Sequence, residues 1–488
     1  MKKWVLGLGV AVLALGTVVG ARTAMFEPGA VADGSKIKVA PAAPFDAAAA
    51  ASHLSQSVQI KTVSNQNVAE NQLSEWDKLH GWLASTYPKT HAAMQKELVG
   101  QTLVYTWPGS DTSAQPIIMM AHQDVVPVTA GTEKDWKYQP FAGTIAEGAV
   151  WGRGTIDDKG SLVALFEAME ALAVQGFKPK RTIYLVSGHD EEAGGTGAKA
   201  AADLLQSRGV KALFTLDEGG LITSDTPVIN GPAMMIGVAE KGYMTLRVTA
   251  PAVGGHSSMP PAEIGSVNLA KAIIAINDNQ FPMELRGPGA SMLDVLAMKA
   301  GGMTKVAAAN KWLLGGTIKS QMAKSPSSAA LLHTTIAPTM LEGSPKENVL
   351  PQSANALVNY RIAPWDNSAM VLERARAVTR GLGVKVDYTE RAPREPTPVS
   401  SSTSLGWQMI VAAAQAGHPG VIASPYLVVG GTDSRSMTPI SDDVYRFAAI
   451  TLATSETKMI HGTNEHISIK TLESLIAFYT RLLATAAG

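Results

Sequence analysis

The chain has 488 residues, which is room for two domains or for one domain with a large insertion. Its composition is that of an ordinary globular protein, with 46% hydrophobic and 17% charged residues, and its formal net charge is zero. A neutral chain carries no electrostatic footprint for nucleic acid, so we expect no nucleic-acid partner. The chain has no cysteine, which excludes disulfides, cysteine nucleophiles and cysteine-ligated zinc. Any metal must therefore bind to His, Asp and Glu.

Residues 1–24 are typical of an export segment. Lys2-Lys3 precede an uncharged, mostly apolar run from Trp4 to Ala21, which is the arrangement of a signal peptide. The run is also close to the shortest length that spans a bilayer. We therefore expect an exported, periplasmic or extracytoplasmic protein, either soluble after cleavage or anchored to the membrane by this segment. Residues 25–46 are rich in Ala, Pro and Gly and indicate a linker.

Residues 47–239 alternate between helical and strand-like patterns, and we interpret them as the first part of a catalytic domain. A helical stretch comes first, and then strand-like runs alternate with helical runs. This order predicts an α/β fold, with a mostly parallel sheet and helices on both faces. The expected strands are 102–106, 116–121, 181–187 and 212–216, and the expected helices after the first stretch are 159–173 and 198–206.

The pattern changes after about residue 240. Apolar and polar residues alternate strictly from Gly242 to Ala250, and the alternation returns from Ala354 to Ile362. Such alternation predicts strands with one face in water. With the helices expected beside them, residues 240–394 form a small inserted α+β domain. Residues 395–488 then return to complete the catalytic domain and end in an amphipathic helix.

Acidic and histidine side chains gather where strand-like runs end. His122, Glu192 and Asp217 follow three such runs, Asp157 lies at a glycine-bracketed helix start, and His461 lies in a late loop. Ligands of α/β sheets bind outside the carboxyl ends of the strands. We therefore expect these five side chains to converge on one site.

Two imidazoles and three carboxylates suit zinc, cobalt or manganese. Five ligands are more than one open zinc site needs, but they fit two ions about 3.5–4 Å apart if one carboxylate bridges them. Glu191, beside the ligand Glu192, is then placed to act as general base on a metal-activated water. Asp124 is placed to hydrogen-bond the second ring nitrogen of His122. Asp217 and Glu218 point to opposite sides of a continuing strand, so only one of them should be a ligand; we favour Asp217 and keep Glu218 as the alternative.

The chain resembles the M20 metallopeptidase family in five motifs that occur in order. These are Ala121–Val128, Gly152–Gly160, Asp190–Glu192, Leu216–Gly220 and Ile460–Gly462. Within the family it is most similar to the carboxypeptidase S branch. The segments that carry this closer similarity are Trp136–Phe141, Glu347–Pro351 and Gly431–Arg435.

The resemblance implies a co-catalytic hydrolase with two Zn²⁺ per subunit, or Co²⁺ or Mn²⁺ in their place, and with Asp157 as the bridging ligand. It also implies that the inserted domain is a lid or dimerisation domain, so that a homodimer is expected. His256 would help to polarise the scissile carbonyl. Arg361 and the loop of Gly430, Gly431 and Thr432 would face the carboxylate of the substrate.

The predicted function is hydrolysis of a peptide or N-acyl amide bond next to a free carboxylate. A carboxypeptidase on small peptides and an N-acyl amino acid amidohydrolase need the same metals and the same anchor, so the sequence leaves both open. A third interpretation is a metal-bound, non-catalytic peptide-binding protein; Glu191 argues against it, because binding needs no base. A two-metal phosphoesterase would use the same types of ligand.

Overall fold

The computed structural model describes residues 2–488, apart from the side chains of residues 2–9 and 11. The chain divides into two units. Unit 1 contains residues 1–28, 239–399 and 427–431, and unit 2 contains residues 29–238, 400–426 and 432–488. The predicted inserted segment, 240–394, lies within unit 1, which also includes the N-terminal residues and the short segment 427–431.

Unit 2 is organised around a mixed sheet whose central strands are parallel. The strand order is β1-β2-β6-β3-β7-β17-β9-β8-β18, and β16 pairs with β9. Strand β3 pairs in parallel with β6 and β7, and β7 pairs in parallel with β17. The strands are β1 (Gln95–Val99), β2 (Thr102–Trp107), β3 (Ile117–Met120), β6 (Ile183–Ser187), β7 (Ala212–Asp217), β8 (Ile222–Thr226), β9 (Gly231–Glu240), β16 (Ile422–Val428), β17 (Ser441–Arg446) and β18 (Thr451–Leu452).

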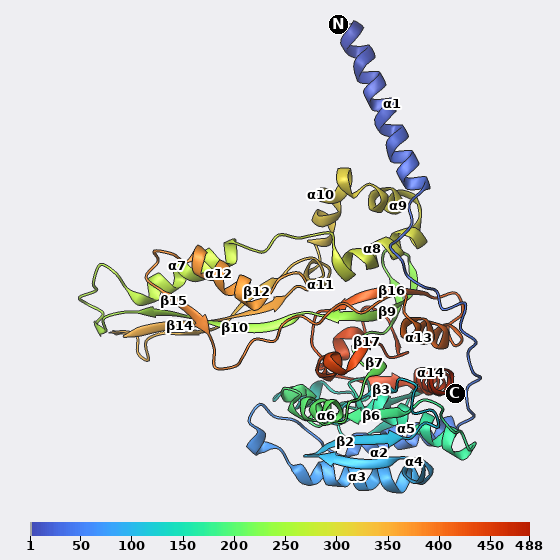
Figure 1. Cartoon of the computed structure of the whole chain (residues 1–488). Helices are drawn as coiled ribbons and strands as arrows, with labels where there is room; N and C mark the ends of the chain where they lie inside the picture. The colour runs from blue at the N-terminus through green and yellow to red at the C-terminus, as the bar shows by residue number, and fades with distance from the viewer. Residues whose placement is uncertain (1) are drawn as a thin grey trace. The chain divides into compact units, whose positions relative to one another are not determined.

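Helices cover both faces of this sheet (Figure 1). Alternate residues of β3 point to opposite faces: Ile117 and Met119 join the larger hydrophobic core, and Ile118 and Met120 join a smaller one. Both faces are buried, which explains why β3 is continuously apolar. The larger core contains residues of α2 (Ala47–Gln59), α3 (Leu73–Thr86), α5 (Lys159–Val174), α13 (Leu405–Gln415) and α14 (Ile469–Ala487), and the smaller one contains residues of α6 (Thr196–Ser207).

The α/β fold predicted from the sequence is confirmed by this arrangement. The periodic positions of the predicted helices, such as Leu162 and Phe166 in α5 and Leu472 and Leu475 in α14, are fully or almost fully buried. The remaining elements of unit 2 are the short helix α4 (Pro88–Ala93) and a separate three-stranded sheet of β4 (Thr144–Ala146), β5 (Ala149–Trp151) and β19 (His466–Ser468).

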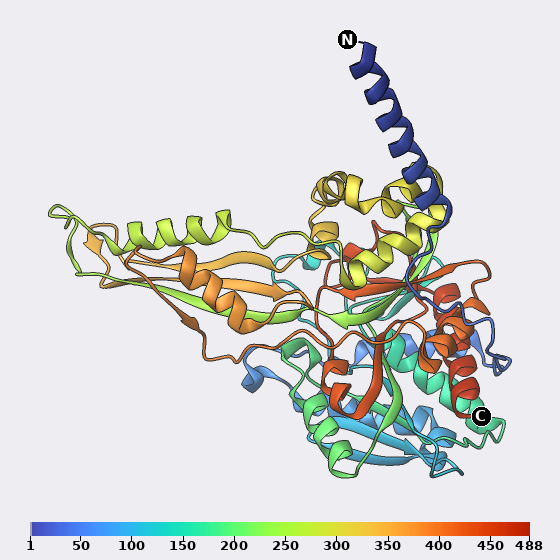
Figure 2. The same cartoon turned by 45° about the horizontal axis from the view of Figure 1, so that its top comes forward.

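Unit 1 contains an antiparallel sheet of order β12-β14-β10-β15. The helices α7 and α12 pack on one face of this sheet (Figure 2). Leu246, Val248 and Leu269 share the core beneath them. The intervening residue Arg247 is exposed, as the strict alternation predicts. The strands are β10 (Gly242–Pro251), β12 (Thr335–Glu342), β14 (Ser353–Ile362) and β15 (Lys385–Tyr388), with a small pair of β11 (Gly255–His256) and β13 (Val349–Leu350), and the helices are α7 (Gly265–Asp278) and α12 (Ser368–Val378).

A helical segment between α7 and β12 was not predicted from the sequence. It consists of α8 (Gly287–Ala300), α9 (Gly302–Ala309), α10 (Lys311–Met322) and α11 (Pro326–Ala330). Glycine pairs at Gly301-Gly302 and Gly315-Gly316 weaken its helical pattern, since glycine is a poor helix former.

The N-terminal residues form helix α1 (Lys2–Ala24). The apolar run from Trp4 to Ala21 lies partly outside the described side chains. Among the described residues, the search for a helix with the length and apolar character needed to cross a membrane finds none.

Candidate metal centre

The loop that carries Asp157 is held by a buried ion pair. Arg153 Nη1 lies 2.7 Å from Glu465 Oε2, and both side chains are almost completely buried. The second oxygen of Glu465 accepts hydrogen bonds from the backbone N–H groups of Gly154, Ile156 and Asp157, at 3.0, 2.9 and 3.2 Å. Arg153 Nη2 also donates to the backbone oxygen of His461 at 3.1 Å. Arg153 and Glu465 therefore connect the Asp157 loop to the His461 loop.

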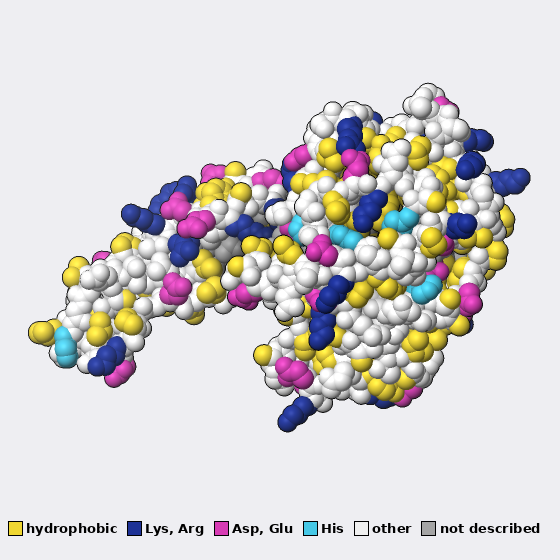
Figure 3. All heavy atoms as spheres, turned by 90° about the horizontal axis from the view of Figure 1, so that it is seen from below, with side chains coloured by type: hydrophobic (Ala, Val, Ile, Leu, Met, Phe, Trp, Pro, Cys, Tyr) yellow, Lys and Arg dark blue, Asp and Glu magenta, His cyan; other side chains and the backbone are white. Residues whose placement is uncertain are grey.

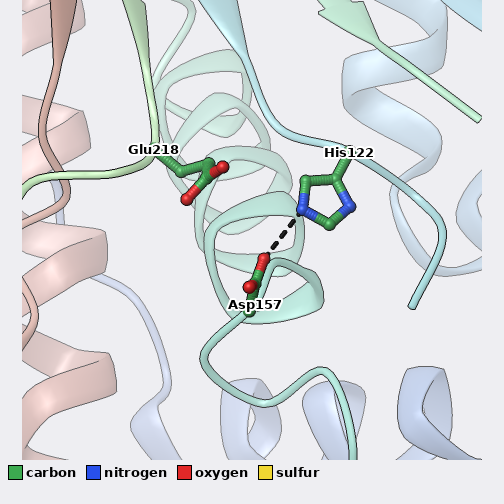
Figure 4. Close-up of side chains that lie close together, drawn as sticks. All are labelled: His122, Asp157 and Glu218. Atoms are coloured by element: carbon green, nitrogen blue, oxygen red, sulfur yellow. Dashed lines mark hydrogen bonds and ion pairs between the residues drawn. The ribbon is translucent and has the colours of Figure 1, made fainter. Parts of the chain in front are cut away.

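His122 follows β3 and is buried with a fixed ring orientation. Its Nδ1 lies 3.0 Å from the backbone oxygen of Asp124 and 3.3 Å from Asp124 Oδ1. Its Nε2 lies 2.9 Å from Asp157 Oδ1 (Figure 4). The two carboxylate oxygens of Asp124 also accept hydrogen bonds from the backbone N–H groups of Glu191 and Glu192, at 3.2 and 3.1 Å. Asp124 thus orients both the imidazole and the turn that carries the two glutamates.

His461 approaches the other oxygen of Asp157. Its Nε2 lies 3.0 Å from Asp157 Oδ2 and 3.1 Å from Glu192 Oε1. His461 has a left-handed backbone (φ 59°), a conformation that costs a non-glycine residue energy and recurs at functional sites. The two oxygens of Asp157 therefore each face one imidazole, which is the geometry expected of a carboxylate that bridges two ions.

Among the side chains that the structure describes, three groups have ligand atoms within 4.8 Å of one another, close enough to share an ion. His122, Asp157 and Glu218 form the first, which Figure 4 shows with all three side chains pointing to one centre. Asp157, Glu192 and His461 form the second, and His122, Glu191 and Glu192 form the third. Asp157 belongs to the first two groups, so those groups describe two adjacent sites with one shared ligand.

Asp217, the ligand favoured from the sequence, lies in none of these groups. Its Oδ2 accepts a hydrogen bond from the backbone N–H of Ser434 at 2.8 Å. Glu218 is the next residue, and its side chain points toward His122 and Asp157. Side chains of successive residues in an extended chain point in opposite directions, and Glu218, directly after β7, is the one that faces the centre. The geometry therefore favours the alternative ligand, Glu218, over Asp217.

The electrostatics of the centre fit a bound cation. Burial raises the pKa of Glu218 and of Glu191 well above their usual range, and neighbouring carboxylates raise both further. Hydrogen bonds to Asp157 and Glu192 raise the pKa of His461 to about 10. Two imidazoles thus face a larger number of crowded carboxylates, and buried charges of one sign require a counter-charge. The donor set of His, Asp and Glu is one that zinc, cobalt or manganese accepts.

The residues predicted to bind substrate belong mainly to unit 1. His256, Arg361, Gly430 and Gly431 lie in that unit, and Thr432 lies in unit 2. His256 is exposed on β11, and its Nδ1 lies 2.7 Å from Ser258 Oγ.

Arg361 is partly buried on β14. Its guanidinium lies 4.8 Å from the ring centre of Tyr243. Among the described residues, no carboxylate pairs with this guanidinium.

The sequence analysis missed the roles of Arg153 and Glu465. Arg153 occurs within a motif segment and Glu465 lies shortly after another, but a buried ion pair between residues 312 positions apart leaves no periodic signal. The signal that could have found them is a charged residue in each of two glycine-containing loops that also carry candidate ligands.

Comparison with known proteins identifies the family of the chain. The sequence model described as Peptidase family M20/M25/M40 matches residues 118–485. An N-fatty-acyl-amino acid synthase/hydrolase from Danio rerio is 37% identical over 439 residues, which cover 87% of this chain and 83% of that protein. Carboxypeptidase S from Saccharomyces cerevisiae is 32% identical over 477 residues, which cover 87% of this chain and 82% of that protein.

Solved structures show the same fold at lower identity. An M20 family metallo-carboxypeptidase from Sulfolobus solfataricus has a TM-score of 0.66 at 17% identity, covering 88% of this chain and 97% of that chain. Human carnosine dipeptidase 1 has a TM-score of 0.61 at 17% identity, covering 90% of this chain and 96% of that chain.

Proposed function

Because the chain belongs to peptidase family M20/M25/M40 and is therefore a hydrolytic enzyme, we propose that it is a two-metal hydrolase of the carboxypeptidase S type. It cleaves a peptide or N-acyl amide bond next to a free carboxylate. The observation that carries the proposal is the position of Asp157, with one oxygen 2.9 Å from His122 and the other 3.0 Å from His461.

In this proposal His122, Asp157 and Glu218 hold one ion, and Asp157, Glu192 and His461 hold the other. Two Zn²⁺ per subunit are the proposed ions, and Co²⁺ and Mn²⁺ suit the same donors. Such a pair, when bound, would lower the pKa of a bound water and polarise a carbonyl oxygen. Glu191 would accept a proton from the attacking water and return it to the leaving nitrogen. Asp124 acts through His122 by fixing its ring.

Substitution of the two neighbours at the end of β7 tests the choice of Glu218. We expect Glu218→Gln to lower the metal content from two ions per chain to one, because Gln is a weaker, uncharged ligand. Asp217→Asn should keep both ions, since Asn still accepts the hydrogen bond from Ser434. Elemental analysis of the two purified variants measures the difference. Loss of metal from Asp217→Asn but not from Glu218→Gln would show that Asp217 is the ligand.

The substrate class is tested with matched pairs of compounds. Dipeptides and N-acyl amino acids are assayed beside the same compounds with the carboxylate converted to an amide, and phosphate esters form an unrelated set. We expect cleavage only of compounds with a free carboxylate, loss of cleavage with a chelator, and recovery with Zn²⁺. Cleavage of phosphate esters alone, or full activity on amides, would contradict the proposal.

An N-acyl amino acid amidohydrolase is the second candidate, and the 37% identity to an N-fatty-acyl-amino acid synthase/hydrolase favours it. The same panel distinguishes the two candidates, because N-acyl amino acids with short and long chains are compared with dipeptides of similar size. Higher kcat/KM for the N-acyl compounds assigns the second function.

Arg361 is the proposed anchor for the substrate carboxylate, with His256 polarising the carbonyl and Gly430, Gly431 and Thr432 forming the rest of the carboxylate site. The role of Arg361 is supported by its partly buried guanidinium, which has no carboxylate partner among the residues that the structure describes. Hydrogen bonds to charged groups contribute about 1.5–3 kcal/mol, so Arg361→Met should lower kcat/KM roughly 10- to 100-fold.

A matched control for this variant is Arg391→Met. Arg391 also lies over the ring of Tyr243, at 5.1 Å, but it is exposed. We expect the control to be close to wild type, and Arg361→Met to lose the preference for free carboxylates over amides. An equal loss on both kinds of substrate would show that Arg361 is structural.

The organisation of the chain completes the proposal. Residues 240–394 act as a lid or dimerisation domain, and the protein is exported as a homodimer. Light scattering on the purified protein measures the subunit number, and N-terminal sequencing of exported protein shows whether residues 1–24 are removed. A monomer found inside the cell with an intact N-terminus would contradict this part.

A further inference from the structure

Helices α9 and α10 expose large apolar side chains outside every core of unit 1. Met303, Trp312 and Leu313 are 76%, 55% and 46% exposed. On α10 the exposed residues recur at helical spacing, with Gly316, Thr317 and Ser320 beside the two apolar ones. Grouped apolar side chains on a surface mark a place of interaction, whereas isolated ones do not. We refer to Met303, Trp312 and Leu313 with their helices as the α9–α10 face.

The charge of this segment is one-sided, although the whole chain is neutral. Residues 287–330 contain Asp294 as their only acidic residue, and its carboxylate lies 2.6 Å from Lys311 Nζ. The other lysines of the segment form no ion pair among the described residues; they are Lys299, Lys305, Lys319 and Lys324. Elsewhere the two signs are mixed, as on the face shown in Figure 3. The segment therefore carries a net positive charge of four.

The N-terminal helix α1 packs beside α9 in the same unit (Figures 1 and 2). Asn310 is completely buried, and its side-chain amide donates to Thr23 Oγ1 at 3.1 Å and to the backbone oxygen of Val19 at 3.4 Å. Arg22 Nε donates to the backbone oxygen of Ala309 at 3.4 Å.

The part of α1 that precedes these contacts remains exposed and apolar. Its exposed residues include Leu13, at 73%, and also Val10, Val12, Leu15 and Val18. Two neighbouring apolar surfaces, one on α1 and one on α9–α10, therefore lie in a single unit.

We propose that α1 and the α9–α10 face together form a surface that docks on an anionic lipid bilayer. Tryptophan and leucine enter the boundary between headgroups and acyl chains, and lysines remain near the headgroups. Unpaired lysines with few acidic neighbours complement a negative membrane surface. A protein partner fits less well, because lysine is depleted from protein–protein interfaces.

The absence of cysteine from the chain permits a site-specific test. A single cysteine is introduced as Met303→Cys, Leu313→Cys or Leu13→Cys, and each is labelled with an environment-sensitive fluorophore. Ile274→Cys on α7 is the matched control, because Ile274 is 60% exposed in the same unit but lies outside the α9–α10 face. The full-length labelled proteins are mixed with vesicles of phosphatidylcholine, with or without phosphatidylglycerol.

We expect the labels at positions 303, 313 and 13 to enter an apolar environment and to be quenched by nitroxide lipids, while the label at 274 stays in water. A response at position 13 alone would overturn the proposal, because the bilayer would then contact only α1. A response at 303 or 313 without vesicles, accompanied by self-association, would assign the face to a second copy of the chain and would also overturn it.

The charge is tested separately. A lysine near an anionic membrane contributes roughly a fivefold gain in binding, so Lys305→Gln with Lys319→Gln should lower binding to phosphatidylglycerol vesicles roughly 25-fold. Lys271→Gln on α7 is the control and should have little effect. Equal binding of the wild-type protein to neutral and anionic vesicles would contradict the assignment to an anionic bilayer.

Discussion

Glu191→Gln is expected to lose most turnover, by about 10²–10⁴-fold, while metal content and substrate affinity stay near those of the wild type. Glu191 and Glu192 are adjacent and are both held by Asp124, but only Glu192 also approaches Asp157 and His461. Gln at position 191 keeps the shape of the side chain and one hydrogen bond. It cannot accept the proton that the proposed mechanism removes from water, so the chemical step should fail and binding should remain.

Glu192→Gln is the matched variant for this prediction. Glu192 Oε1 lies 3.1 Å from His461 Nε2, and loss of its charge should release an ion. Metal analysis and turnover are measured side by side for the two variants. If Glu191→Gln loses metal as readily as Glu192→Gln does, Glu191 is a ligand. If it keeps both metal and full rate, no general base is needed at position 191.

The largest expected effect on stability follows from Glu465→Gln. Burial raises the pKa of Glu465, and the guanidinium of Arg153 with the surrounding N–H groups opposes that shift. Removal of the charge leaves the buried Arg153 without its counter-ion, and breaking a buried pair in this way costs about 3–5 kcal/mol. We expect a clear fall in the denaturant midpoint of unfolding and weaker metal binding, because the Asp157 and His461 loops lose their connection.

A surface ion pair provides the control for Glu465→Gln. Glu147 and Lys137 lie 2.6 Å apart but are half exposed, so Glu147→Gln should change stability little. Addition of Arg153→Met to Glu465→Gln should recover part of the loss, since no buried charge then remains unpaired. A midpoint for Glu465→Gln equal to that of Glu147→Gln would show that the buried pair does not hold the two loops.

The sequence predicts the α/β fold because the pattern of each element agrees with its place in the structure. Strand β3 is apolar throughout, since both of its faces are buried, and β10 alternates, since one of its faces is in water. The choice between Asp217 and Glu218 was left open by this reasoning, and the structure favours Glu218. If the alternation of side chains along a strand is counted one residue out, the opposite side chain is predicted to face the site. Neither Asp217 nor Glu218 has a periodic neighbour that fixes this alternation.

Long-range contacts explain what else was missed. The bond network of Glu465 joins residues more than 300 positions apart, and pairing of that kind is set by the folded chain. Helices α8–α11 form although glycines interrupt their helical sequence pattern. The segment also makes tertiary contacts, such as the hydrogen bonds from the buried Asn310 to α1. In both cases tertiary packing outweighs local preference.

The most direct test of the two-metal centre is anomalous diffraction at the zinc absorption edge, from crystals of the zinc-loaded protein. The account predicts two peaks about 3.5–4 Å apart, with Asp157 between them, one bound by His122 and Glu218 and the other by Glu192 and His461. A single peak, or two peaks without Asp157 between them, would contradict it.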